Sequence, residues 1–326
     1  MRAGLDVSPL DQTRAGTARY LRHLEAEAGG ELVRIGYPGR SRAATMYRDA
    51  VWYPVVLPRL ASIRSLDVLH CPTFRGPLAP PECPLVVTVH DLAVLRHPET
   101  FNLWTRRYSR LCVPRVARAA RLVIAVSEHT RRELVDLLAA PDEKIRVVPN
   151  GVAETFGPSG PAESGDYVLA VGTLEPRKNL ERLAEATGRL GLELRVVGAK
   201  GWGRVDLDAA GVRWLGEVSD EQLAGLYRGA LCLAYPSLYE GFGLPILEAM
   251  ASGTPVVTSR GGATEEVAGG AALLVDPLDP ASIAAGIEEA ASRRGQLVRL
   301  GLERAAMFSW KETARATVEV YREAAA

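Results

Sequence analysis

Short apolar runs alternate with segments of helical periodicity from one end of the chain to the other. Strands of four or five residues are predicted in the first half at 3–7, 33–37, 68–71, 85–89, 122–126 and 145–148, and in the second half at 168–171, 194–197, 212–215, 231–235, 255–258 and 272–275. Continuously apolar strands separated by helices are typical of parallel sheets covered on both faces. The pattern therefore predicts two open, doubly wound α/β sheets in series.

A segment without periodicity separates the two halves. Residues 148–166 read VPNGVAETFGPSGPAESGD, a composition rich in Pro, Gly and Ser that is typical of a linker. We therefore expect one domain over residues 1–155 and a second over residues 156–308. The last segment, residues 309–326, has the pattern of an amphipathic helix, with Ser309 as its candidate cap.

Composition narrows the classes of function. The 326 residues suffice for two domains of about 150 residues each. Lys plus Arg (39) equals Asp plus Glu (39), so no net positive charge favours a nucleic-acid partner. The amino terminus lacks a signal-peptide pattern and no apolar run reaches ~18 residues, which predicts a cytoplasmic protein. The cysteines are scattered and are predicted to be reduced structural thiols: Cys71, Cys83, Cys112 and Cys232.

The strongest chemical signal is the stretch YPSLYEGFGLPILEAMASGTPVVTSRGG, residues 235–262. An apolar run meets a glycine loop at 241–243, and Pro245 then suits the first turn of a helix. Glycines before a helix start let backbone amides approach an anion, and the helix dipole favours phosphate there. Two carboxylates, Glu240 and Glu248, flank this loop and would repel phosphate unless they met neutral donors such as sugar hydroxyls. The stretch therefore predicts a site for a sugar linked to a phosphate.

At these residues the chain resembles glycosyltransferase family 4, the retaining enzymes that use nucleotide sugars and have the two-domain GT-B fold. The resemblance rests on the Glu-x7-Glu motif, Glu240 to Glu248, within YEGFGLPILEAMASGTPVV. It implies two Rossmann-like domains facing a central cleft, with the nucleotide sugar held by the second and the acceptor by the first. The last helix, residues 309–326, is implied to cross back and join the first domain. It also implies that Glu240 and the loop position the sugar and phosphate while Glu248 binds the ribose hydroxyls. The implied loop contacts are Gly241, Phe242, Gly243 and Leu244.

A second phosphate signal follows the predicted strand 168–171. Arg177 and Lys178 stand before a predicted helix, where two cations oppose the helix dipole and so indicate an anion to be neutralised. The resemblance assigns Lys178 and Arg177 to the donor diphosphate, where they stabilise the leaving nucleoside diphosphate. Many family members carry Arg directly after the motif glycine, whereas this chain has Thr173, so which guanidinium contacts the phosphate stays open.

No metal or other cofactor is expected. Asp206-Leu207-Asp208 imitates the Asp-x-Asp metal signature of another glycosyltransferase fold, but it lies far from any glycine loop and is interpreted as solvated charge. The positive charges of Arg177 and Lys178, with amides at helix starts, would replace a divalent cation at the leaving group.

The first half supplies three further candidates. Gly16 and Thr17 open a helix after the first strand, where they either reach the donor phosphate or only begin the helix. His90 follows the strand 85–89, and ligands of open α/β sheets bind at such carboxyl ends. The resemblance places His90 beside the transferred sugar. Asp91 is explained equally well as a cap of the next helix.

A basic stretch in the first half points to a surface. Six arginines but no acidic residue occur between Thr100 and Ser127, interleaved with apolar and aromatic residues over 104–121. Such a face either binds anionic lipid headgroups or a diphosphate-linked acceptor, or is simply a solvated basic face. The arginines are Arg106, Arg107, Arg110, Arg115, Arg118 and Arg121.

These observations together predict a metal-independent hexosyltransferase, with GDP-mannose or a UDP-sugar as donor. The acceptor would be a hydroxyl of a saccharide, a lipid-linked or a small molecule, as in polysaccharide biosynthesis. Two alternatives remain: a catalytically silent subunit that binds a nucleotide sugar, and a nucleotide-dependent oxidoreductase. The second is disfavoured because Gly-x-Gly-x-x-Gly is missing after the first strand.

Overall fold

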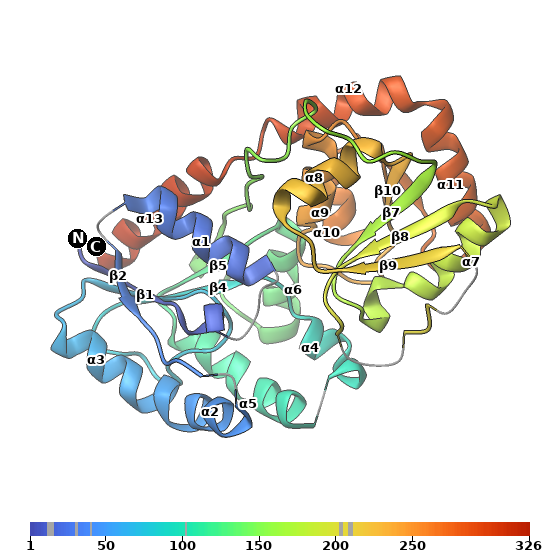
Figure 1. The fold of residues 1–326 in the computed structure, drawn as a ribbon. Coiled ribbons are helices and arrows are strands. Elements are labelled where there is room, and N and C mark those ends of the chain that lie inside the picture. Colours follow the sequence, from blue (N-terminus) through green and yellow to red (C-terminus); the bar gives the residue numbers. More distant parts are fainter. Residues whose placement is uncertain (12–15, 30–31, 40, 102, 202–204, 208–210) are drawn as a thin grey trace. The chain divides into compact units, whose positions relative to one another are not determined.

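The chain forms two units, each built on a six-stranded parallel sheet (Figure 1). The structure is a computed structural model that describes all residues except 12–15, 30–31, 40, 102, 202–204 and 208–210. One unit consists of Met1–Gly151 with Trp310–Ala326, and the other of Val152–Ser309. The predicted α/β class and the two serial sheets are confirmed.

The first sheet has the strand order β2-β1-β3-β4-β5-β6, and all its neighbours are parallel. Because β1 pairs with both β2 and β3, the chain reverses its direction of winding at β1, as in doubly wound folds. Its strands are β1 (Ala3–Asp6), β2 (Leu32–Ile35), β3 (Val68–Cys71), β4 (Leu85–Val89), β5 (Leu122–Ala125) and β6 (Ile145–Val147).

Helices cover both faces of this sheet. The α-helices are α1 (Gly16–Ala28), α2 (Arg42–Tyr47), α3 (Leu57–Ile63), α4 (Ala93–Arg96), α5 (Leu103–Ala119), α6 (Glu128–Leu138) and α13 (Trp310–Ala325). A π-helix, η3 (Arg48–Val56), joins α2 to α3, and short 3-10 turns are η1 (Ser8–Asp11), η4 (Pro98–Thr100) and η5 (Asp142–Lys144). The last helix, α13, packs against α1, so the carboxyl end of the chain belongs to the first unit.

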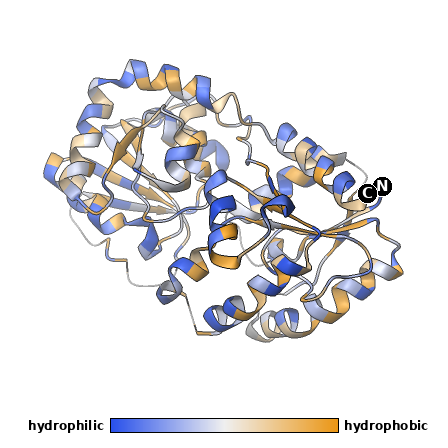
Figure 2. Cartoon of the chain, turned by 180° about the vertical axis from the view of Figure 1, so that it is seen from behind, coloured by the Kyte–Doolittle hydropathy of each residue, from blue (hydrophilic) through white to orange (hydrophobic). Residues whose placement is uncertain are grey.

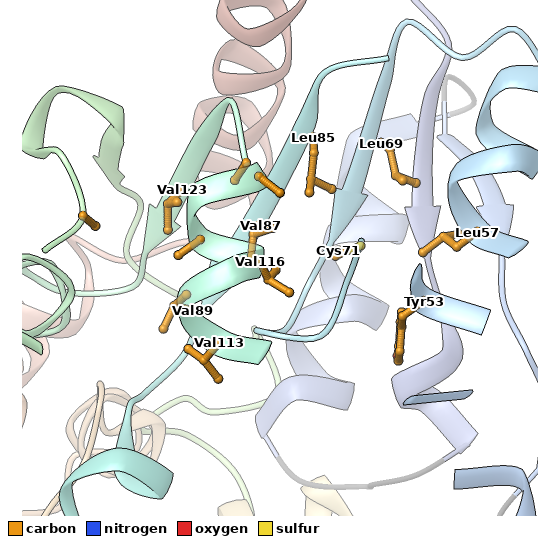
Figure 3. Packing of buried hydrophobic residues seen from close by; sticks show 14 of the residues in the cluster. Tyr53, Leu57, Leu69, Cys71, Leu85, Val87, Val89, Val113, Val116 and Val123 are labelled. Carbon is orange, nitrogen blue, oxygen red and sulfur yellow. The ribbon is translucent and has the colours of Figure 1, made fainter. Parts of the chain in front are cut away.

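Alternate residues of each strand enter two different cores. Val68 and Val86 pack with Val320 and Tyr321 of α13 on one face. Leu69, Val87 and their neighbours pack on the other face against α3 and α5, where Val116 of α5 lies beside Val87 (Figure 3). Because both faces are covered, the central strands β3, β4 and β5 are buried at every position and mostly apolar, and this is the reason that they could be predicted as apolar runs.

The second sheet has the order β12-β11-β10-β7-β8-β9. Its strands are β7 (Tyr167–Val171), β8 (Glu193–Val197), β9 (Val212–Gly216), β10 (Cys232–Tyr235), β11 (Val256–Ser259) and β12 (Leu273–Val275). Its helices are η6 (Pro176–Lys178), α7 (Leu180–Leu190), α8 (Asp220–Gly229), α9 (Leu244–Ala251), α10 (Gly262–Ala268), α11 (Pro280–Ser292) and α12 (Arg294–Ala305).

The second sheet is also covered on both faces. Helices α7 and α11 share one core with β7, β8 and β10, and α8, α9 and α10 gather on the opposite face (Figure 1). The strands of both sheets are mostly hydrophobic, whereas the helices also carry hydrophilic residues (Figure 2). Each strand lies within two residues of its predicted position. Between β6 and β7 the only strand-like feature in the described residues is the isolated bridge of Val152 with Ser309.

Candidate active site

The two loops that are predicted to contact phosphate follow two central strands of the second sheet and meet at the carboxyl ends of these strands. Strands β7 and β10 are neighbours, paired at Val168 with Cys232, although 62 residues separate Lys178 from Glu240. The strand order reverses between them, and ligands of open α/β sheets bind at the carboxyl ends of strands at such a point. The loop after β7 and the loop after β10 therefore form the candidate site.

Lys178 and Glu240 lie in direct contact. The Nζ atom of Lys178 is 2.5 Å from Oε1 of Glu240 and 2.7 Å from the hydroxyl of Tyr235. The Tyr235 hydroxyl in turn donates to Glu240 Oε1 at 2.8 Å. Nη1 of Arg177 donates to the other oxygen, Oε2, at 2.8 Å, and its Nε donates to Glu175 at 2.7 Å. Two cations and two carboxylates are thus gathered in one cluster.

Burial and these charges set the protonation of the cluster. Burial alone would raise the pKa of Glu240, but Arg177 and Lys178, with the hydroxyl of Tyr235, hold it at about 2. Burial lowers the pKa of Lys178 against the opposing charge of Glu240. Burial and the Glu240 charge raise the pKa of Tyr235 well above its ordinary value, so its hydroxyl keeps its proton. Glu240 is therefore an acceptor of hydrogen bonds and a poor proton base at neutral pH.

Backbone contacts lock the two loops together. The amide of Leu238 donates to the carbonyl of Arg177 at 2.8 Å, and Nδ2 of Asn179 donates to the carbonyls of Pro236 and Pro277. Asn179 has a left-handed φ of 60°, which Asn tolerates better than most residues. The cations were predicted at a helix start; the structure places them in η6, which Asn179 separates from the first residue of α7, Leu180.

Gly172 makes room for Lys178. Its φ is 152°, and a Cβ atom there would lie 2.9 Å from Cε of Lys178. A small pocket between β7 and β10 is lined by Gly172, Lys178, Tyr235 and Ser237. The hydroxyl of Ser237 is buried in this region and has no hydrogen-bond partner among the described residues.

The glycine loop leads into α9 as predicted, with the helix beginning at Leu244, one residue before Pro245. Gly243 stands before the helix with a φ of 120°. Phe242 is buried and lies edge-to-face on Phe308, with ring centroids 6.2 Å apart. The contacts assigned to the loop amides at 241–244 stay predictions.

Glu248 lies on α9 and is only 3% exposed. Its Oε2 accepts a hydrogen bond from the hydroxyl of Tyr227 on α8 at 3.0 Å. Tyr227 therefore fixes the position of this second motif glutamate, and the binding of ribose hydroxyls by Glu248 stays a prediction.

In the first unit, His90 directly follows β4 as predicted. Its Nε2 is 3.1 Å from the carbonyl oxygen of Pro72, so this nitrogen carries the proton. Burial lowers the pKa of His90 to about 4, so the ring is neutral at pH 7. Tyr20 of α1 holds the ring edge-to-face, with centroids 4.9 Å apart. Asp91 accepts from the amide of Ala93, the first residue of α4, but it stands one residue before the cap position, which Leu92 occupies.

Gly16 and Thr17 open α1 as predicted. Residues 12–15 of the loop before them lie outside the described residues, and their contact with a phosphate stays a prediction. Of the Asp-x-Asp stretch, Asp206 is exposed, and Asp208 lies outside the described residues. Within the described ranges, no group of three or more His, Cys, Asp or Glu side chains could hold a metal ion. The four cysteines are free.

Three residues of the cluster were not predicted. Tyr235 is the last residue of the predicted strand 231–235, for which the sequence predicted no chemical role, whereas its hydroxyl bonds Lys178 and Glu240. Glu175 precedes the two cations and neutralises Arg177. Ser237, which lines the pocket beside the cluster, had no predicted role either. Their common signal is position at the carboxyl end of a central strand.

Comparisons with known proteins cover both units. The family model "Glycosyltransferase Family 4" matches residues 2–156, and "Glycosyl transferases group 1" matches residues 165–293. O-antigen chain mannosyltransferase B of Escherichia coli is 34% identical over 265 residues, 73% of this chain and 70% of that protein. The MMP alpha-(1->4)-mannosyltransferase of Mycolicibacterium hassiacum is 34% identical over 273 residues, 74% of this chain and 66% of that protein.

More distant relatives and solved structures agree with these matches. D-inositol 3-phosphate glycosyltransferase of Kineococcus radiotolerans is 35% identical, over 64% of this chain and 58% of that protein. The chain thus spans about three fifths to seven tenths of the length of these relatives. Sucrose-phosphate synthase of Thermosynechococcus elongatus has a TM-score of 0.80 at 21% identity, covering 98% of both chains. Anabaena HepE with UDP and glucose has a TM-score of 0.75 at 17% identity, covering 99% of this chain and 100% of that chain. At such identities these structures support the fold alone.

Proposed function

The chain belongs to glycosyltransferase family 4, and from this premise we propose that it is a retaining hexosyltransferase that takes its sugar from a nucleotide sugar. The observation that carries the proposal is the contact of Lys178, Arg177 and Glu240 at the switch point of the second sheet. Cations and a low-pKa carboxylate side by side suit a ligand with both a diphosphate and hydroxyl groups.

Each member of the cluster has a chemical task in this proposal. Lys178 and Arg177 neutralise the charge that develops on the leaving diphosphate, with amides of the loop 241–244 at the start of α9. Glu240 accepts a hydrogen bond from a sugar hydroxyl, and Glu248 holds the ribose hydroxyls. In the first unit, His90 meets the transferred sugar as a neutral ring, and the amides of Gly16 and Thr17 meet the donor phosphate.

The reaction itself follows from the protonation of the cluster. A carboxylate with a pKa of about 2 cannot take a proton from the acceptor hydroxyl efficiently at neutral pH. We therefore assign that proton to the departing phosphate oxygen. The acceptor oxygen bonds to the anomeric carbon on the face that the diphosphate leaves, and the bond from that carbon to the phosphate oxygen breaks. No metal ion or other cofactor takes part in this scheme.

The first donor to test is GDP-mannose, with UDP-sugars second. Two of the relatives are named mannosyltransferases, which favours mannose over other hexoses. We further propose that the acceptor is a hydroxyl of a saccharide, free or lipid-linked.

A donor screen tests the proposal. Thermal unfolding is recorded with GDP-mannose, UDP-glucose, UDP-N-acetylglucosamine and reduced nicotinamide nucleotide, because a ligand that binds the native state raises its melting temperature. We expect a rise with one class of nucleotide sugar, together with slow hydrolysis of that donor. Binding without any hydrolysis or transfer would favour the silent subunit, and no binding of any nucleotide sugar would refute the proposal.

The surface of α5 favours peripheral contact with an anionic membrane. Leu103, Trp104 and Leu111 are 67%, 44% and 58% exposed. They lie on the same helix as the exposed arginines Arg106, Arg107, Arg110, Arg115 and Arg118. Apolar side chains among arginines suit insertion at lipid headgroups. No helix in the described ranges has both the length and the apolar character to cross a bilayer.

Vesicle flotation tests this contact. We expect binding to vesicles that contain phosphatidylglycerol at low salt, and little binding to pure phosphatidylcholine. The variant Trp104→Ser/Leu111→Ser should lose the binding while keeping its donor hydrolysis. No flotation of the native protein with the anionic vesicles would leave α5 as a solvated basic face.

A further inference from the structure

Tyr235 stands at the centre of the cluster without a role in the scheme above. Its side chain is buried, with the residue only 4% exposed, and it closes a three-membered ring of hydrogen bonds with Lys178 and Glu240. We propose that Tyr235 is a positioning residue that aims the amine of Lys178 and the carboxylate of Glu240 at the nucleotide sugar. The inference rests on the proposed function and deepens it.

The ring is anchored to the sheet through Tyr235. This residue is the last of β10, paired in register with Thr258 of β11, whose hydroxyl donates to the Tyr235 carbonyl at 2.9 Å. The Lys178 amine also lies 4.8 Å from the centroid of the Tyr235 ring, within range of a cation–π contact. Lys178 and Glu240 come from loops, whereas Tyr235 comes from a central strand. The tyrosine is therefore the fixed member of the ring.

Most of the hydrogen-bond donors of Lys178 and acceptors of Glu240 are already used within the ring. A lysine amine has three N–H donors. One N–H of Lys178 donates to Tyr235 and a second donates to Glu240, so one N–H is left. Glu240 Oε1 accepts from both Lys178 and Tyr235 and is filled, whereas Oε2 accepts from Arg177 alone among the described residues. One N–H and one lone pair thus remain for a ligand: a donor suited to a phosphate oxygen and an acceptor suited to a sugar hydroxyl.

The hydroxyl of Tyr235 selects which N–H and which lone pair remain. Phenylalanine at this position would free a second N–H of Lys178 and a second lone pair on Oε1 without changing the charge of the site. The ion pair itself would stay, so affinity for a diphosphate should change little. What would be lost is the alignment of both groups in the transition state, which appears in kcat rather than in binding.

The variant Tyr235→Phe tests the inference, with Tyr167→Phe as a matched control. Tyr167 is a fully buried tyrosine of the same unit whose hydroxyl also makes a hydrogen bond, to the carbonyl of Leu226 at 2.7 Å. It contacts none of the site residues in the described structure. Both variants lose one buried hydroxyl, so a merely structural effect should be similar in the two.

Two measurements are made on each variant: the Kd of GDP and UDP by calorimetry, and the rate of donor hydrolysis at saturating GDP-mannose or UDP-glucose. For Tyr235→Phe we expect a kcat lowered about 10- to 100-fold with Kd changed less than about threefold, because hydrogen bonds to charged groups are among the stronger ones. For Tyr167→Phe we expect kcat within about twofold of the native value.

A double-mutant cycle separates positioning from general damage. If Tyr235 acts through Glu240, adding Tyr235→Phe to Glu240→Gln should lower the residual rate less than about twofold. Equal rates for Tyr235→Phe and Tyr167→Phe would refute the inference, and additive losses in the cycle would refute the role of Tyr235 in positioning Glu240, while an active native protein upheld the proposed function. A native protein that neither binds nor hydrolyses any nucleotide sugar would refute both.

Discussion

Removal of Glu240 should damage the protein more than removal of Lys178, although the two side chains form one ion pair. In Lys178→Ala, the Glu240 carboxylate keeps Arg177 and the Tyr235 hydroxyl as partners. In Glu240→Ala, Lys178 keeps only the Tyr235 hydroxyl among its hydrogen-bond partners in the described structure. The first variant leaves a charge that is still paired, and the second leaves a buried cation without a carboxylate in contact.

The expected losses of unfolding free energy differ because only Glu240→Ala leaves a buried charge without an oppositely charged partner in contact. Breaking a buried ion pair by removing one partner costs about 3–5 kcal/mol of unfolding free energy. We expect a loss in that range for Glu240→Ala and a loss of about 1–3 kcal/mol for Lys178→Ala, where Arg177 still compensates the carboxylate. At about 2–4 °C per kcal/mol for a domain of this size, the two melting temperatures should differ by about 4–8 °C. Both variants should retain the fold and lose transfer.

The change of unfolding free energy with pH shows whether the buried charge of Lys178 causes the loss in Glu240→Ala. A buried Lys178 without Glu240 escapes its cost by releasing its proton, while the same lysine stays protonated in the unfolded chain. The unfolded state of Glu240→Ala then binds more protons than the folded state, so its stability rises with pH by up to about 1.4 kcal/mol per unit. Between pH 7 and 9 the deficit of Glu240→Ala should therefore shrink, and that of Lys178→Ala should not.

The assay is urea denaturation at pH 7, 8 and 9, with donor hydrolysis measured at pH 7. Arg189→Ala is the control, because Arg189 and Glu185 form an exposed pair on α7 whose loss should cost less than about 1 kcal/mol. Equal losses in the two site variants, or a deficit of Glu240→Ala that stays constant with pH, would show that the Lys178 charge does not depend on Glu240.

Three further predictions concern other parts of the molecule. Gly172→Ala should lower donor hydrolysis about 10-fold or more, because its Cβ would press on Cε of Lys178, and steady-state kinetics with a circular-dichroism check of the fold would measure this. Burial lowers the pKa of His70 to about 3 and that of His90 to about 4, so the unfolded chain takes up protons at a higher pH than the folded protein. The free energy of unfolding should therefore fall as the pH drops from about 6.5 toward 4. Calorimetric scans of the native protein should show this fall, and a melting temperature that stays constant over this range would contradict it. Treatment with EDTA should leave the rate of donor hydrolysis unchanged within about twofold, and a loss restored by Mg²⁺ would contradict the role given to Lys178 and Arg177.

The fold was predictable from the chain because its strands are buried on both faces. The run at residues 85–89 is apolar except for Thr88 and buried at every position, and it becomes a strand between two helical layers. The start of α9 was predictable for another local reason, the glycine loop followed by Pro245. Patterns of this kind involve only a few neighbouring residues, so they predict a strand or a helix start without the order of strands in the sheet.

The contacts of the site could not be predicted in the same way. Lys178 and Glu240 touch because β7 lies beside β10, and the order of strands in a sheet is not encoded in the periodicity of either strand. Tyr235 gave no chemical signal, because an aromatic side chain at the end of an apolar strand usually packs in the core. The 3-10 turn that carries Arg177 and Lys178 depends on the left-handed Asn179, which is held by carbonyls from two other loops.

The two cations and two carboxylates of the cluster balance in charge, and Glu240 therefore has a role before any nucleotide sugar binds. Burial disfavours the charged form of Lys178, so without a carboxylate in contact the amine would tend to release its proton and lose its attraction for a diphosphate. Glu240 keeps that charge in place when no anion is bound, while Glu175 pairs with Arg177, whose guanidinium is always charged, and holds its position. A diphosphate then meets cations that are already ionised and held by backbone contacts, and little reorganisation is needed as charge develops on the leaving group. The same carboxylate that orients the sugar thus maintains the cation that holds its leaving group, which is why the loss of Glu240 should weaken both functions together.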